Sequence, residues 1–142
     1  MSIVQGQTTT FKQNCLSGLE NFAVGTPYTY KIALYNGNAS IGTNTTAYTT
    51  TNEIGGTGYT AGGKTLTVIP PMADIAANTV YLSFANVTWN PASFTCRGAL
   101  IYNSTTGASV CVLNFGSDKT ATNTFTVTFP ADTSSDAIIR FS

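Results

Sequence analysis

The chain has 142 residues, a formal net charge of zero and no histidine, and only 8% of its residues are charged. This length favours one domain with a core of its own. Zero net charge gives no long-range field for attracting phosphates, so we expect no binding to nucleic acid or to an anionic membrane surface. The absence of histidine removes the commonest general base and metal ligand. We therefore expect a protein that is not an enzyme and that needs no cofactor or metal.

Residues 1–10 form a candidate N-terminal arm, and residues 11–142 a single domain. The arm lacks the basic and apolar regions of a secretory signal, so the chain is expected to remain in the cytoplasm when made. Ile3 and Val4 are its candidate interaction residues. Because ordering ten residues costs about 1–2 kcal/mol per residue, we expect a neighbouring subunit to order this arm.

One segment has the period of a helix. Apolar residues at Phe11, Cys15, Leu19 and Phe22 are spaced by four, four and three, which predicts a helix from Phe11 to Phe22. Thr10 and Gln13 have the spacing of a capping box, and Gly25 and Pro27 end the pattern. The helix either closes one end of a β core or docks onto a partner together with the arm.

After Pro27 the period changes to two, which predicts strands. Short alternating runs without helical segments between them favour an all-β, antiparallel sandwich or jelly roll of about seven to nine strands. Alternation is lost in 99–102 and 110–113, which predicts a central hairpin covered on both faces, with a turn at 103–109. Residues 40–51 are expected to be a surface excursion with one short strand. The seven predicted strands are 28–34, 64–69, 79–84, 94–102, 110–115, 124–129 and 137–141.

Aromatic residues supply the remaining interaction candidates. The strand 124–129 has threonines on its outer face and little charge, so its edge is expected to be open to a neighbouring subunit, with Phe125 and Phe129 as candidates. Tyr48 and Tyr59 are candidates in the threonine-rich and glycine-rich loops. Trp89, in contrast, is expected to pack in the core at one end of the sandwich.

Two motifs with chemical meaning are interpreted as structural. Residues 58–65 match the phosphate-loop pattern, but the chain continues as a strand and then Pro70–Pro71, where that motif requires a helix. The six carboxylates (Glu20, Glu53, Asp74, Asp118, Asp132 and Asp136) are scattered and indicate neither a catalytic pair nor a calcium loop. Cys15, Cys96 and Cys111 are expected to be buried thiols, with an interchain disulfide as the less favoured alternative.

Three stretches resemble small structural proteins of bacteriophage virions. They are NEIGGTGYTAGGKTL (52–66), RGALIYNSTTGASVCVLNFGSDKT (97–120) and FTVTFPADTSSDAIIR (125–140), and the segments 11–19 and 30–35 are similar too. The resemblance implies a β-sandwich that assembles into the particle, and it implies no catalytic residues. The three cysteines are not part of the family pattern.

We therefore expect a structural protein of a tailed-phage virion, in first place a capsid cement or decoration protein. Its partners would be further copies of itself, forming a trimer under local threefold symmetry, and the major capsid protein. The alternative is a receptor-binding or fibre-associated β module that recognises host glycans. Its recognition residues would be exposed tyrosines, namely Tyr35, Tyr48, Tyr59 and Tyr102.

Overall fold

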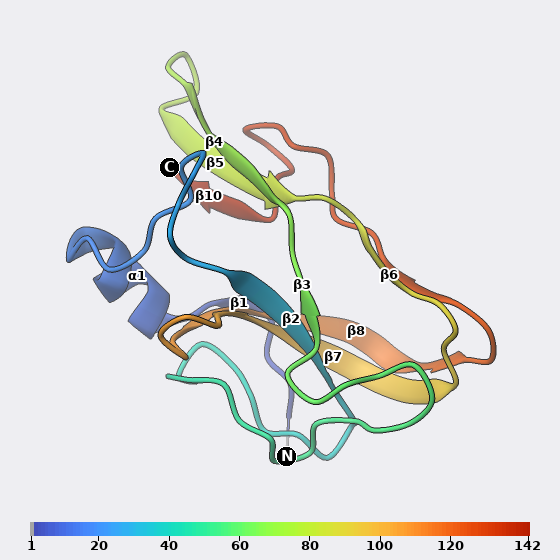
Figure 1. Cartoon of the computed structure of the whole chain (residues 1–142). Coiled ribbons are helices and arrows are strands. Elements are labelled where there is room, and N and C mark those ends of the chain that lie inside the picture. The colour runs from blue at the N-terminus through green and yellow to red at the C-terminus, as the bar shows by residue number, and fades with distance from the viewer. Residues whose placement is uncertain (1) are drawn as a thin grey trace.

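Antiparallel strands make up most of the regular structure in the computed structural model, which describes residues 2–142 (Figure 1). A five-stranded sheet, in the order β1-β8-β7-β2-β3, packs against a three-stranded sheet β10-β5-β4 and a two-stranded ribbon β6-β9. The main core lies between these layers and draws residues from all three. The strands are β1 (Gly6–Gln7), β2 (Tyr30–Tyr35), β3 (Lys64–Thr65), β4 (Val68–Asp74), β5 (Thr79–Phe84), β6 (Val87–Trp89), β7 (Phe94–Asn103), β8 (Ser109–Ala121), β9 (Phe125–Val127) and β10 (Ile139–Phe141). The predicted all-β sandwich with one short helix is confirmed, although the described residues form ten strands where about seven to nine were expected.

The hairpin β7–β8 is the centre of the large sheet, as its continuous apolar runs predict. Residues 99–102 and 110–113 are all buried, because the sheet is covered on both faces. One face contacts the main core, and the other contacts a smaller cluster that includes Ala33, Tyr35, Leu100 and Val112. Trp89 is buried in the main core, as predicted.

The N-terminal arm belongs to the chain's own sheet. Gly6 and Gln7 pair with β8, and Ile3 forms a parallel bridge with Ile41. Ile3 is buried in the smaller cluster, directly over Gly98, where a β-carbon would come within 2.8 Å of the Ile3 side chain. The expectation that a neighbouring subunit must order the arm is therefore wrong. The large sheet offers it both a free strand edge and an apolar site.

The helix is shorter than predicted and begins earlier. Helix α1 spans Thr9–Leu16, and its N-cap is Thr8, whose hydroxyl accepts from the Phe11 amide at 3.0 Å. Thr10 is not the cap. Gly18, at φ +73°, leaves the helical conformation just after the C-cap Ser17. Phe22 still reaches the core, but from the segment that follows the helix.

Several strand boundaries also differ from expectation. The predicted strand 64–69 is divided into β3 and β4, and β4 continues through Pro70 and Pro71. It can do so because β4 is an edge strand whose register shifts between Ile69 and Met72. Residues 40–51, all of which the structure describes, contain isolated bridges at Ile41 and Ala47 and no strand. Among the described residues, no helix has the length and apolar character needed to span a membrane.

Candidate interaction surface

The six candidate residues from the sequence do not meet on one surface. Val4 is about half exposed, whereas Ile3 and Phe129 are buried inside the chain. Phe125 is half-buried, with its ring 5.9 Å from that of Trp89. Tyr48 and Tyr59 are also half-buried, and both are held by contacts within the chain.

Those contacts converge on Glu53. The hydroxyls of Tyr48 and Tyr59 each donate to the Glu53 carboxylate at 2.5 Å, and the Gly62 amide donates to it at 2.8 Å. Tyr59 also accepts from the Leu34 amide of β2 at 3.0 Å. The network therefore ties two irregular loops to the large sheet, and Glu53 uses both of its oxygens to do so.

The remaining two tyrosines support the same network from inside. Tyr35 and Tyr102 are buried, contrary to the exposure that a glycan-recognising module would require of them. Tyr102 stacks against Tyr48 with ring centroids 4.6 Å apart, and its hydroxyl donates to the Gly62 carbonyl at 2.6 Å. These tyrosines stabilise the loops and do not form exposed loop tips.

The segment 58–65 has the geometry of a turn packed on a sheet. A β-carbon on Gly63 would lie 1.8 Å from the Ile32 carbonyl, and one on Gly58 equally close to the Pro91 carbonyl. The segment ends in β3, and the Lys64 ammonium donates to the Thr88 carbonyl. The exposed side chain of Lys64 is thus bonded to the backbone of β6.

Exposed apolar side chains gather at one end of the molecule, and sequence reasoning did not find them. Of the eight large apolar residues that are strongly exposed in the described chain, seven come from α1 and the segment after it, from the β4–β5 hairpin, or from β10. Figure 1 shows these elements together, on the left and at the top of the view. We call this the apolar end; its residues are Leu16, Leu19, Val24, Met72, Ile75, Val80 and Phe141.

A small apolar pocket of about 100 Å³ opens at this end between α1, β5 and β10. Val80 and Phe141, which are directly paired across β5 and β10, contribute to its exposed lining. Phe11 and Phe22 are buried behind them, and the rings of Phe11 and Phe141 stack at 5.9 Å. The pocket has the size of one aliphatic side chain, and no polar surface lines it.

Glu20 lies in the segment that connects α1 to β2. Its Oε1 accepts from the Tyr30 hydroxyl at 2.9 Å and from the Asn103 side-chain amide at 3.0 Å. Its Oε2 is buried and has no hydrogen-bond partner among the described residues. Burial raises the pKa of this carboxyl above its ordinary value, against the lowering effect of the hydrogen bonds.

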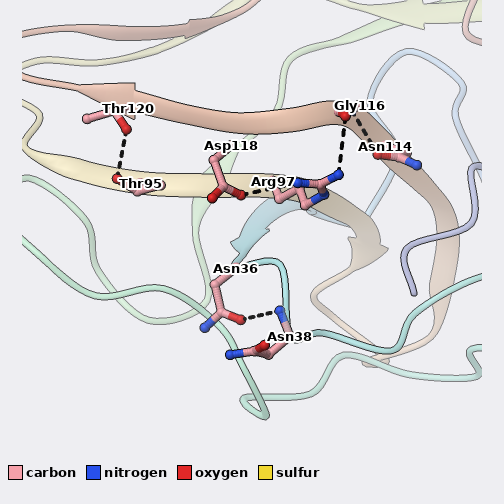
Figure 2. Close-up of polar contacts among 8 residues, drawn as sticks. All are labelled: Asn36, Asn38, Thr95, Arg97, Asn114, Gly116, Asp118 and Thr120. Atoms are coloured by element: carbon pink, nitrogen blue, oxygen red, sulfur yellow. Dashed lines mark hydrogen bonds and ion pairs between the residues drawn. The ribbon is translucent and has the colours of Figure 1, made fainter. Parts of the chain in front are cut away.

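A second region, around the first part of β7 and the second part of β8 in the large sheet, is polar and held by its own contacts (Figure 2). Arg97 lies 3.5 Å from Asp118, and its guanidinium donates to the Gly116 carbonyl at 3.3 Å. The hydroxyls of Thr95 and Thr120 are 3.0 Å apart across β7 and β8. We call this the polar end; it comprises the eight residues labelled in Figure 2, namely Asn36, Asn38, Thr95, Arg97, Asn114, Gly116, Asp118 and Thr120.

The cysteines offer no reactive site. All three are free; Cys96 and Cys111 are buried and Cys15 is half-buried. Burial raises the pKa of Cys15 to about 11 and the pKa values of Cys96 and Cys111 to about 12. No cluster of three or more potential metal ligands occurs within residues 2–142.

Comparison of the chain with models of protein families, with curated proteins and with solved structures gives no match.

The sequence carried only a weak signal for the apolar end. Val24 and Ile75 are large aliphatic residues within turn-like stretches, and Leu16 lies outside the Phe11–Cys15 spacing. Val80, in contrast, alternates in phase with the buried Leu82 and Phe84. Val80 is exposed because it is the second residue of β5, and the core covers this strand only from Leu82 onwards.

Proposed function

We propose that this chain is a structural, non-enzymatic protein of a tailed-phage virion, and specifically a cement or decoration protein that binds the major capsid protein and stabilises the head shell. The apolar end is the observation that carries the proposal. Leu16, Val24 and Ile75 are 92%, 86% and 82% exposed, in a chain with few charges elsewhere. Large apolar patches on soluble proteins mark surfaces that another protein covers.

The physical advantage of such a surface lies in burial and repetition. Removing apolar surface from water contributes about 25 cal/mol per Å², and a shell repeats the same contact at every symmetry-related site. The resemblance of 52–66, 97–120 and 125–140 to virion proteins supports placing that partner in the particle. The proposed assembly is a trimer at a local threefold axis, for which light scattering should give the mass of three chains.

The alternative of a glycan-recognising module has less support. It relies on exposed aromatic side chains, but Tyr35 and Tyr102 are buried. Tyr48 and Tyr59 already donate their hydroxyls to Glu53. None of the four tyrosines named for this role, all of them within the described residues, is freely exposed to stack on a sugar ring.

Charge placed on the apolar end tests the proposal. The triple variant Leu16→Asp, Val24→Asp and Ile75→Asp alters only strongly exposed positions, so the fold should persist. A matched control, Asn38→Asp, Ser117→Asp and Thr122→Asp, adds the same charge at or near the polar end, also at exposed positions. We expect the first variant to lose at least about tenfold in affinity for capsid shells in cosedimentation, and the control to change by less than about twofold.

The two variants separate the possible outcomes. Equal losses would mean that net charge, and not the apolar end, governs binding. If neither the wild-type chain nor either variant binds shells at micromolar concentration, the cement function is wrong.

A further inference from the structure

Glu20 is a carboxyl group with one satisfied and one unsatisfied oxygen. Oε1 accepts from Tyr30 of β2 and from Asn103 at the end of β7, whereas the buried Oε2 accepts from no described residue. The Asn103 side chain is fully buried, and its own oxygen accepts from the amides of Thr105 and Thr106. Glu20 thus attaches the segment 17–29 to two rigid parts of the large sheet.

No cation among residues 2–142 compensates the charge that an ionised Glu20 would carry. The titratable groups that face it are the thiol of Cys15 on α1 and the phenol of Tyr30 on β2. Two neutral amide side chains face it as well, Asn14 on α1 and Asn103 at the end of β7. The only ion pair within the described residues is Arg97–Asp118, at the polar end. A negative charge here would meet burial, an unpartnered Oε2 and no counterion, and these outweigh the hydrogen bonds that favour the charged form, so the pKa of the Glu20 carboxyl is raised.

We propose that Glu20 is a proton-dependent latch, whose neutral form holds the segment 17–29 against the sheet and whose ionised form loosens it. In the latched form the proton is on Oε2, while Oε1 keeps both of its hydrogen bonds. As pH rises, the proton passes to solvent and leaves a charge on the oxygen that lacks a donor. Tyr30 and Asn103 still bond Oε1, but they do not solvate Oε2.

The latch controls part of the apolar end. Segment 17–29 carries Leu19 and Val24, and it also carries Phe22, which stacks on Tyr30 with ring centroids 4.3 Å apart and lines the apolar pocket. Loosening the segment would therefore disturb both the exposed apolar side chains and the wall of the pocket. This consequence for docking rests on the proposed function, whereas the latch itself is a property of the isolated chain.

Direct titration of the carboxyl tests the latch without any partner. In protein labelled with ¹³C at glutamate side chains, the resonance lost in Glu20→Gln identifies Glu20. We expect its titration midpoint to lie above the ordinary value of 4.5, because burial raises the pKa of this carboxyl. A midpoint at or below 4.5 would overturn the proposal.

The dynamic consequence has its own measurement. Hydrogen exchange of amides 18–26, corrected for intrinsic base catalysis, should quicken several-fold in the wild type as pH rises through that midpoint. In Glu20→Gln the corrected exchange rate should not change with pH, because the glutamine side chain is neutral at every pH. If Glu20→Gln fails to fold, the wild-type exchange profile alone decides, since a flat profile contradicts the latch.

Glu53→Gln is the matched control, because both oxygens of Glu53 have donors. It should lower the melting temperature at pH 7 and leave the pH dependence of hydrogen exchange at amides 18–26 as in the wild type.

The melting temperature of Glu20→Gln minus that of the wild type should become more positive as pH rises. A difference that is flat or of the opposite sign would overturn the latch. Absence of shell binding at every pH would contradict only the proposed function.

Discussion

The polar end, which lies on the large sheet, and the apolar end, formed by α1, the β4–β5 hairpin and β10, differ in how their side chains are satisfied. At the polar end, Arg97 bonds Asp118 and the Gly116 carbonyl, and the hydroxyls of Thr95 and Thr120 pair across the strands (Figure 2). At the apolar end, aromatic rings pack beneath side chains that remain in water, and Val80 and Phe141 line a pocket without a polar wall. The polar side chains of the polar end bond one another and the backbone, whereas the apolar end leaves apolar surface exposed to water.

The difference extends to the protection of strand edges. The outer part of β8 carries Gly116 at φ +83° and the charged residues Asp118 and Lys119, which together discourage pairing with another strand. The elements of the apolar end also carry charged residues, but Leu16, Val24 and Ile75 among them are apolar and 92%, 86% and 82% exposed. The contrast indicates that association is resisted at one end and permitted at the other.

The largest expected effect is on packing at the apolar end. Phe11 is completely buried between α1 and the core, so Phe11→Ala should destabilise the fold by about 3–5 kcal/mol, as loss of a buried aromatic ring usually does. Leu16→Ala, on the same helix but 92% exposed, is the control and should change stability by less than about 0.5 kcal/mol. Urea denaturation measures both. A small loss in Phe11→Ala would show that α1 is not needed to close the core.

Alkaline pH should destabilise both ends. Burial raises the pKa of Tyr30 near Glu20, and it likewise raises those of Tyr35, Tyr48 and Tyr59 in the Glu53 network; that of Tyr102 rises to about 12. Their ordinary pKa in the unfolded chain is 10. The stability that the protonated tyrosines give the fold is therefore fully present below about pH 10. It is lost as the pH rises towards the pKa values of these tyrosines in the folded chain.

Spectroscopy can follow this transition directly. These five phenols should stay protonated while the fold persists and should ionise together with unfolding, which absorbance near 295 nm and circular dichroism report in parallel. Ionisation of all the tyrosines near pH 10 with an intact fold would contradict the prediction.

A smaller effect is expected from a single hydroxyl beside the polar end. Tyr59→Phe removes one donor from Glu53 and the acceptor of the Leu34 amide, so it should cost about 1–3 kcal/mol. Tyr81→Phe is the control, because the Tyr81 hydroxyl forms no hydrogen bond within the described residues; it should be close to neutral. Equal losses in the two variants would mean that the Glu53 network adds little to stability.

Much of the fold was predictable from periodicity. Runs of alternating residues located most strands, and loss of alternation located the buried hairpin β7–β8, because a strand covered on both faces has no polar side. The helix was predicted too long because Phe22 continues the helical spacing by chance. Helix α1 ends before Gly18, and Phe22 enters the core from the loop that follows the helix. Periodicity thus pointed to the core residues Phe11 and Phe22 but not to the backbone that carries Phe22, and it included Leu19, which is 53% exposed.

The site was less predictable, because its features depend on distant parts of the chain. Asn103 lies 83 positions from Glu20 along the sequence, and no local pattern connects them. Val80 has the alternation of a buried residue but lies at the exposed start of β5. The sequence offers Ile3 to a partner, because the site that takes it up is formed by β2, β7 and β8, far along the chain.

The smallest expected effect is at the ion pair of the polar end. The side chains of Arg97 and Asp118 are 42% and 62% exposed, so solvent and salt screen their attraction and the pair should contribute less than about 1 kcal/mol. Arg97→Ala also loses the bond to the Gly116 carbonyl, which water can replace at this exposed position. A double-mutant cycle of Arg97→Ala and Asp118→Ala in low and high salt isolates the pair, with Lys119→Ala as a control for removing one positive charge. We expect a coupling that disappears in high salt. A large, salt-independent coupling would mean that the polar end is held by its charges, and the contrast with the apolar end would then be one of strength as well as of chemistry.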